Sequence, residues 1–445
     1  MHIQNNKKIL IIGNGFRAMM SAFMCSKISK DVSIITNSEN IHGIMGNLEW
    51  EGGRFDRGYQ FFDGLDSNDR KILDEFVGKD ILYNFGYGAS TFTNNKIYEN
   101  HAIPYWPHKG FLFAFKSFFE MLALVFKKDK KKIVTYEDLI QSLPVSIKKI
   151  LEKACLRNTN LLPNEVSHLA SNFSPLLHYR QTILPEKISY LLKKIKFFDK
   201  RIACRRKILK LDEISLYPKG KYIGYVSKIM QEKLEKIGVK ILISKEAKVF
   251  VKNDYLSLKI NNQTLNPDNI LMVAEMDDIL SFFEEKISEK KNNHYVSQIF
   301  IYFSVKNILS KFQYVHGNDI DFFINRINNV SLYGEKTSKN ESVISVEIPT
   351  KTNTDIWNKP EKYLKEIWLE VKKMKMVDEN EKFINYKIFK IPKTVSIPLK
   401  NFENSKKKLE NLVETKYGNK IFFPGLGEIT RKKFINAVEN CIKKI

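Results

Sequence analysis

The sequence contains few cysteines, which argues against protein classes that depend on disulfides or on cysteine-bound zinc. Its 445 residues include four cysteines, Cys25, Cys155, Cys204 and Cys441, and no two of them form a Cys-x-x-Cys pair. This wide spacing argues against a disulfide framework and against a zinc site of the zinc-finger kind. We therefore expect a reducing compartment, a cytoplasmic location and no metal site.

Long hydrophobic runs are also missing. The first apolar run, Ile9–Ile12, is too short for the hydrophobic region of a secretory signal peptide. The most apolar segment, 110–126, contains Lys116 and Glu120 and is shorter than the roughly 20 residues that a spanning helix needs. We favour a core helix of a second domain here. The alternative is a helix in the membrane interface, in which residues 111–132 make a peripheral contact with the inner face of the membrane.

Acidic residues are scarce relative to basic ones. The chain has 73 lysines and arginines against 50 aspartates and glutamates, which gives a net charge of +23. The lysines are spread along the whole sequence rather than gathered in one basic patch, so we expect no nucleic-acid partner. The charge is compatible with an anionic small-molecule substrate or an anionic membrane surface.

Three common catalytic motifs are absent. The sequence has no Gly-x-Ser-x-Gly, no His-Glu-x-x-His and no P-loop pattern, which argues against a serine hydrolase, a zinc protease and a P-loop nucleotidase. Nothing indicates chemistry performed by protein side chains alone. We therefore expect a bound cofactor to carry the reaction.

The segment 7–27 predicts a strand, a tight turn and a helix. The apolar run Ile9–Ile12 is typical of a buried parallel strand. It is followed by a dinucleotide-binding fingerprint with alanine in its third small position, Gly13-Asn14-Gly15-Phe16-Arg17-Ala18. Gly13 permits the turn, Gly15 lets a pyrophosphate approach the backbone, and Ala18 keeps the helix close to the strand. The phosphates would lie at the helix N-terminus, beside Phe16 and Arg17. The alternative is a structural turn without a ligand.

The acidic residue that usually binds the ribose is not where the fingerprint expects it. The second strand, Val32–Ile35, is followed by Thr36, Asn37, Ser38 and Glu39. The ribose partner would be Thr36, Asn37 or a displaced Glu39. Among the dinucleotide cofactors, this departure argues most strongly against a nicotinamide dinucleotide.

A second motif, GGRFDRGYQFF at 52–62, follows soon after the fingerprint. Together the two motifs resemble the FAD-dependent amine-oxidase-like superfamily, which includes protoporphyrinogen oxidase, phytoene desaturase and, more distantly, UDP-galactopyranose mutase. The resemblance implies an FAD cofactor, with Asp56 and Gly58 in a loop beside the flavin. It extends through a middle unit at 216–274, where Val249 is expected to contact the cofactor.

The C-terminal segment 420–430 resembles the terminal FAD motif of the same superfamily. The resemblance implies that Gly425 and an acidic residue contact the cofactor while the following helix points its N-terminus at the flavin. The acidic position is either Leu426, which would be a departure, or Glu428 after an inserted Gly427. A last sheet strand with a packing helix is the structural alternative.

We predict an α/β protein, in which a Rossmann-type FAD-binding domain carries an inserted substrate domain of mixed helices and β-sheet. The FAD-binding domain comprises 1–95, 205–280 and 395–445, and the substrate domain comprises 96–204 and 281–394. This division follows from strand-and-glycine units in three separate segments, which one parallel sheet can gather only if the intervening segments pack elsewhere.

Candidates for the substrate side lie in the inserted domain. We select Arg180, Tyr105 and His108, from a wider set that adds Trp106, His178 and Tyr179. Arg180 is the preferred anion anchor, because a guanidinium binds phosphate or carboxylate in a bidentate manner.

Three functions are open. The first is an FAD-dependent oxidoreductase that transfers hydride from a small molecule to flavin. The second is a redox-neutral flavin enzyme resembling UDP-galactopyranose mutase, acting on a nucleotide-sugar in surface-glycan biosynthesis. The third is a non-catalytic nucleotide-binding protein. The sequence does not indicate the oligomeric state.

Overall fold

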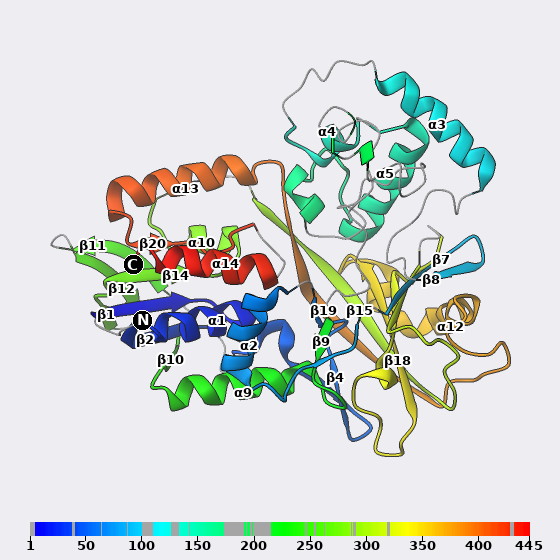
Figure 1. Cartoon of the computed structure of the whole chain (residues 1–445), viewed down its shortest axis with the longest axis horizontal. Coiled ribbons are helices and arrows are strands. Elements are labelled where there is room, and N and C mark those ends of the chain that lie inside the picture. Colours follow the sequence, from blue (N-terminus) through cyan, green and yellow to red (C-terminus); the bar gives the residue numbers. More distant parts are fainter. Residues whose placement is uncertain are drawn as a thin grey trace.

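A computed structural model shows how these segments are arranged (Figure 1). The structure describes residues 5–37, 41–63, 65–86, 88–99, 110–125, 133–141, 143–172, 215–244, 247–252, 255–261, 263–285, 291–317, 321–427 and 431–445, with a few single positions between them.

One of the two halves of the folded molecule is built on a five-stranded parallel sheet. Its strands, in spatial order, are β10 (Lys240–Ile243), β2 (Ser29–Thr36), β1 (Asn5–Ile12), β14 (Asn269–Met272) and β20 (Ile421–Phe422). Successive residues of β1 belong to different hydrophobic clusters: Ile9 and Ile11 to one, Leu10 and Ile12 to the other. Because side chains alternate along a strand, this pattern places β1 at the centre of a sheet that is buried on both faces.

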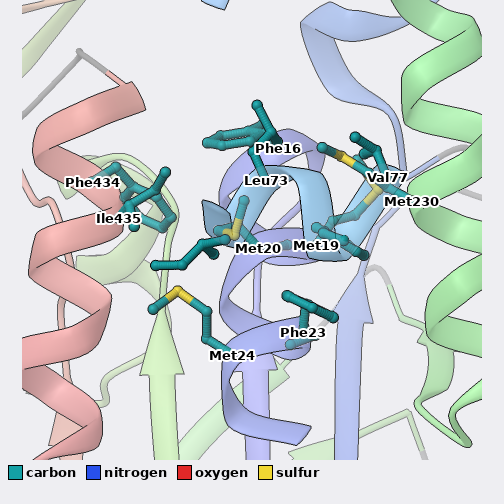
Figure 2. Packing of buried hydrophobic residues seen from close by; sticks show 14 of the residues in the cluster. Phe16, Met19, Met20, Phe23, Met24, Leu73, Val77, Met230, Phe434 and Ile435 are labelled. Carbon is teal, nitrogen blue, oxygen red and sulfur yellow. The ribbon is translucent and has the colours of Figure 1, made fainter. Parts of the chain in front are cut away.

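Helices cover one face of this sheet. They are α1 (Gly15–Ser26), α2 (Ser67–Val77), α9 (Ile223–Lys236) and α14 (Arg431–Ile442). Figure 2 shows Met19, Met20 and Phe23 of α1 packed between side chains of the other three helices. The apolar residues of 16–25 therefore fix α1 against the strand that precedes it.

A small antiparallel sheet and two further helices cover the other face. The sheet has the order β11 (Ala247–Lys252), β12 (Tyr255–Ile260), β13 (Gln263–Leu265), and the helices are α10 (Met276–Ser281) and α13 (Phe402–Tyr417). Three segments distant in the sequence thus build one α/β unit around the parallel sheet, in agreement with the predicted fold class.

The other half of the folded molecule is built on a seven-stranded mixed sheet. Its order is β19 (Asn385–Pro398), β15 (Asn293–Val305), β18 (Ser342–Thr350), β17 (Arg326–Asn329), β16 (Tyr314–Gly317), β7 (Ala89–Thr93) and β8 (Lys96–Glu99). Residues 355–373 form α11 (Asp355–Asn358), η5 (Pro360–Tyr363) and α12 (Leu364–Lys373), and α12 packs into the core of this half.

The predicted domain boundary at residue 95 falls within the hairpin β7–β8, which joins the seven-stranded sheet because β7 pairs with β16. Residues 330–332 form a 3-10 helix, η4 (Val330–Leu332). The division into a cofactor domain and a substrate domain stays a prediction.

Short elements join the two halves. The hairpin β3 (Asn47–Trp50) and β4 (Gly53–Asp56) leads from the parallel sheet toward the large one. A three-stranded sheet of β5 (Phe62–Asp63), β9 (Ser215–Tyr217) and β6 (Tyr83–Asn84) lies beside it. The residues between 50 and 63 thus lie at the junction, where ligand pockets are common.

A helical lobe projects from the large sheet (Figure 1). It contains α3 (Phe111–Val125), α4 (Tyr136–Ile140), α5 (Val145–Thr159) and the 3-10 helix η3 (His168–Asn172). The preferred prediction for α3, a helix buried in a core, is wrong for one of its faces, because Phe111, Phe115 and Phe119 are exposed. No helix in the described ranges is long and apolar enough to cross a membrane.

Candidate functional site

The glycine-rich turn lies at the carboxyl edge of the parallel sheet. Gly13 has a φ of +149°, and a Cβ atom there would lie 2.6 Å from Cγ2 of Val273, the residue after β14. Its N–H donates to the carbonyl of Ile35 at 3.0 Å. Gly13 is therefore locked between two neighbouring strands, as the fingerprint predicts for the first glycine.

Gly15 makes a close approach to a second loop. It has a φ of +68°, and its N–H donates to the carbonyl of Ile41 at 2.6 Å. A Cβ on Gly43 would lie 3.1 Å from the Cα of Gly15, so glycine at both positions brings the two backbones together. The segment 41–46 therefore forms one wall of the turn.

The N-terminus of α1 has the character of an anion site. Its N-cap, Asn14, makes no side-chain capping bond, and the first turn contains no acidic residue. Arg17 lies in that turn, with a half-exposed side chain 3.7 Å from Oε1 of Glu275. Aligned backbone N–H groups and the helix dipole favour negative charge at this position. Phe16 and Ala18 are buried and hold the helix in place.

Other predicted cofactor residues gather at the same edge of the sheet. Thr36 ends β2, where it is buried, and Asn37 follows it with an exposed side chain. Gly425 follows β20 with a φ of +69°, and a Cβ there would lie 2.6 Å from the ring of Phe434 on α14. The carboxyl ends of β1, β2, β14 and β20 are thus drawn together although they lie far apart in the sequence. This edge is where open α/β sheets bind their ligands.

Val249 lies on β11 and is fully buried. Its N–H donates to the carbonyl of Phe282 at 2.8 Å. A cofactor contact at Val249 would therefore use its carbonyl or its side chain.

Asp56 ties three segments together at the junction. Its Oδ1 accepts a hydrogen bond of 2.7 Å from the backbone N–H of Ile223, which opens α9, and its Oδ2 accepts one of 2.6 Å from the Tyr217 hydroxyl. The Tyr302 hydroxyl on β15 donates to the Asp56 carbonyl. Burial, together with the Asp56 charge, raises the pKa of Tyr217 well above its usual value, so the hydroxyl stays a donor.

Gly58 is packed against the large sheet. It has a φ of +83°, and a Cβ there would lie 2.8 Å from the Phe300 ring and 3.1 Å from Oε1 of Glu347. The next residue, Tyr59, donates its N–H to that same carboxylate oxygen at 3.0 Å. The loop that the resemblance places beside a flavin is therefore anchored directly to β18.

Glu347 also holds a buried arginine that the sequence analysis did not select. Nη2 of Arg326 donates to both carboxylate oxygens, at 2.7 and 3.0 Å, and Nδ2 of Asn328 donates to Oε1 at 2.8 Å. Burial alone would lower the pKa of Arg326, but the Glu347 carboxylate more than offsets it and the pKa is raised. Arginine is scarce in this chain, so the criterion that selected Arg180 would also have selected Arg326.

An aromatic cluster borders this ion pair. The ring of Phe61 stacks on Tyr59 at 4.5 Å and on Tyr217 at 4.6 Å, and meets Tyr333 edge-on at 4.8 Å. The guanidinium of Arg326 lies over the Tyr59 ring at 5.2 Å. A small pocket beside the cluster is lined by Arg54, Asp56, Tyr217, Lys221, Tyr302 and Tyr333. The junction therefore combines buried aromatic rings with the cations that line this small pocket.

The remaining site predictions fall on residues outside the described ranges. These are Arg180, Tyr105 and His108 on the substrate side, Glu428 in the C-terminal motif and the displaced ribose candidate Glu39. Their roles stay predictions. Within the described residues, no group of three or more histidine, cysteine or acidic side chains is arranged to hold a metal ion.

Comparisons with known proteins agree with this architecture. No protein-family model matches the sequence, and no curated protein sequence is significantly similar to it. Solved structures are similar over nearly the whole chain. A reduced UDP-galactopyranose mutase superimposes with a TM-score of 0.73 at 12% identity, over 99% of this chain and 96% of that one.

Two oxidases are similar at the same level of identity. A proposed protoporphyrinogen oxidase from Exiguobacterium has a TM-score of 0.62, and cyclohexylamine oxidase from Brevibacterium oxydans has one of 0.60. Each is 12% identical and covers 99% of both chains. The chain thus shares the fold of these solved structures, which include proteins of the kinds that its motifs resemble.

Proposed function

We propose that the chain binds FAD at the carboxyl edge of its parallel sheet and acts as a flavoenzyme on a small molecule at the junction. The observation that carries the proposal is the N-terminus of α1. It has no side-chain cap and no acidic residue in its first turn, and it lies beside the close approach of Gly15 to Gly43. A pyrophosphate placed there would interact favourably with the helix dipole and with Arg17.

The residues around this turn fit the other parts of FAD. The ribose would lie at the end of β2, where Thr36 and Asn37 offer a hydroxyl and an amide in place of the usual carboxylate. The flavin would extend toward the junction, with Asp56 and Gly58 on one side and Gly425 on the other. The Asp56 carboxylate already accepts bonds from Tyr217 and Ile223, so we assign it a role in positioning the loop.

The first reaction class is oxidation of the substrate. When bound, the flavin would supply a hydride acceptor, while the chain binds and orients the substrate and excludes water. The cations Arg54 and Lys221 line the pocket at the junction and favour a substrate with an anionic part. Arg326 is committed to Glu347, so we do not assign it to the substrate. Arg180 stays the proposed anion anchor.

A second class is a redox-neutral reaction on a nucleotide-sugar. One observation favours it: the mutase superimposes with a TM-score of 0.73, against 0.62 and 0.60 for the two oxidases at similar coverage. In this class the flavin would have to be reduced before the substrate is converted.

Two assays on the purified flavin-loaded chain separate these classes. In the first, oxidised protein is mixed without oxygen with a panel of amines and other hydride donors, and bleaching of the flavin absorption reports oxidation. In the second, dithionite-reduced protein is incubated with UDP-sugars, and isomerised sugar is detected by chromatography. Bleaching supports the oxidoreductase and isomerisation supports the mutase-like reaction. FAD binding without either activity favours the non-catalytic protein.

A further inference from the structure

The helix α3 carries phenylalanines on both sides, and one row of them is exposed to solvent. Its exposed stripe comprises Phe111, Phe115, Phe119 and Leu122, which are spaced four, four and three residues apart and therefore lie on one face. Phe111 is 80% exposed, and Phe115 and Phe119 are each 53% exposed. Leu112, beside the stripe, is also exposed.

The inward face is fixed by hydrogen bonds to α5. Oε2 of Glu120 accepts from the backbone N–H of Ser146 at 2.9 Å and from its hydroxyl at 2.7 Å. The Ser117 hydroxyl lies 2.7 Å from the same hydroxyl. Because Ser146 lies in the first turn of α5, where Pro144 offers no side-chain cap, Glu120 caps that helix from outside. These bonds, together with the buried Met121, define the side of α3 that meets α5.

The sequence around α3 is basic. The six residues after 126 in the sequence, Lys127-Lys128-Asp129-Lys130-Lys131-Lys132, include five lysines and one aspartate. Lys116 is exposed on α3 itself, and α5 adds the exposed Lys149 and Lys153. An aromatic stripe next to basic residues is the pattern by which interfacial helices bind anionic lipid surfaces. A second copy of the chain would bring like charges together across such a contact.

We propose that α3 docks this protein on the surface of an anionic membrane, with Phe111, Phe115 and Phe119 inserted among the headgroups. The lobe that carries α3 lies at the outer edge of the molecule, away from the parallel sheet (Figure 1). The protein can therefore lie on a membrane with its cofactor edge unobstructed. This docking does not depend on which reaction the site performs.

The test is co-sedimentation of the full chain with vesicles of phosphatidylcholine alone and of phosphatidylcholine mixed with phosphatidylglycerol. We expect binding to the anionic vesicles in about 0.1 M salt and weaker binding at higher salt. A triple variant, Phe111→Gln, Phe115→Gln and Phe119→Gln, should bind at least about tenfold more weakly, because the apolar insertion is lost.

The matched control removes three exposed apolar side chains elsewhere: Tyr255→Gln, Leu309→Gln and Leu369→Gln. It should bind vesicles like the wild type, and both variants should keep the wild-type circular dichroism. The proposal is overturned if the wild type does not bind anionic vesicles, or if the α3 variant binds as well as the control. A wild-type dimer that the α3 variant converts to a monomer, without vesicle binding, would instead make this face a contact between two copies.

Discussion

The hydroxyl of Tyr217 donates a hydrogen bond of 2.6 Å to the Asp56 carboxylate, 161 residues earlier in the chain. Both side chains are buried. The other carboxylate oxygen accepts the N–H of Ile223 at the start of α9, so one aspartate fixes the end of β4, a strand of the junction sheet and a helix. Tyr302 adds the large sheet through the Asp56 carbonyl. Asp56 is thus one of the points at which the two halves of the molecule are held together.

Asp56→Asn should weaken this connection. The amide keeps one acceptor oxygen, so either the buried N–H of Ile223 loses its partner or the Tyr217 hydroxyl keeps only its longer bond of 3.4 Å to the Lys221 carbonyl. We expect the free energy of unfolding to fall by about 1–3 kcal/mol. Urea denaturation measures this loss, and Tyr217→Phe in the Asp56→Asn background should cost less than in the wild type. Asp355→Asn, at an exposed carboxylate beside Lys362, is the control and should leave the unfolding midpoint unchanged. Equal midpoints for Asp56→Asn and the control would contradict the role of Asp56.

Glu347→Gln should destabilise the fold more strongly. It leaves the buried Arg326 guanidinium without a counter-charge and weakens the acceptor used by Tyr59 and Asn328. We expect a loss of about 3–5 kcal/mol. The double variant Arg326→Met and Glu347→Met removes both charges and should be more stable than Glu347→Gln alone. If the double variant is instead less stable than Glu347→Gln, the ion pair is not coupled as the geometry indicates.

His316 should make stability depend on pH. Burial first, and then the charge of Arg326, lower the pKa of its imidazole from 6.5 to about 3. Between these two pH values the unfolded chain takes up a proton that the folded chain does not. The contribution of the neutral imidazole to the free energy of unfolding is therefore complete above pH 6.5 and is lost as the pH is lowered toward 3. The free energy of unfolding lost through His316 approaches about 1.4 kcal/mol for each pH unit in this range.

Thermal unfolding at several pH values checks this dependence. His316→Gln removes the titrating group, so its midpoint should fall less steeply between neutral pH and mild acid than that of the wild type. Parallel curves for the two proteins would show that the imidazole already titrates normally in the fold.

Local sequence patterns predicted the parallel-sheet half well. The strand β1 and the helix α1 follow from a four-residue apolar run and a glycine turn, both of which lie within one short stretch. The start of α9, at Ile223, is harder to predict from local sequence. Its N-terminus is capped by Asp56, far away in the sequence, and its own N-cap, Tyr222, makes no capping bond. When a distant segment supplies the capping group, the residues around the helix start do not show where the helix begins.

The large sheet and its buried charges were harder to predict for the same reason. The strand β19 contains Pro392, which normally argues against a strand, but β19 is an edge strand and its register shifts beside that proline. Arg326 and Glu347 meet across two strands, and neither position shows its partner in the sequence. The exposed face of α3 was misjudged because an apolar run does not reveal which side its neighbours will cover.

Gly15→Val tests the proposed pyrophosphate position. A Cβ at Gly15 would lie 3.6 Å from the carbonyl oxygen of His42, so the valine side chain would fill the space between the turn and the 41–46 segment, and FAD occupancy should be lost from a protein that still folds. Gly238→Val is a matched control. Its φ of +87° carries similar backbone strain to the +68° of Gly15, and a Cβ there would meet nothing within 4 Å. The control should lose stability and keep FAD. Full occupancy in Gly15→Val, measured by absorbance, would remove the turn from the site.

The central claim is that this chain carries FAD. The most direct measurement is the absorption spectrum of the purified wild-type protein, followed by mass analysis of the cofactor released on denaturation. We predict a yellow protein with the two flavin absorption bands and FAD as the released species. A colourless protein that neither binds added FAD nor gains thermal stability from it would contradict the account.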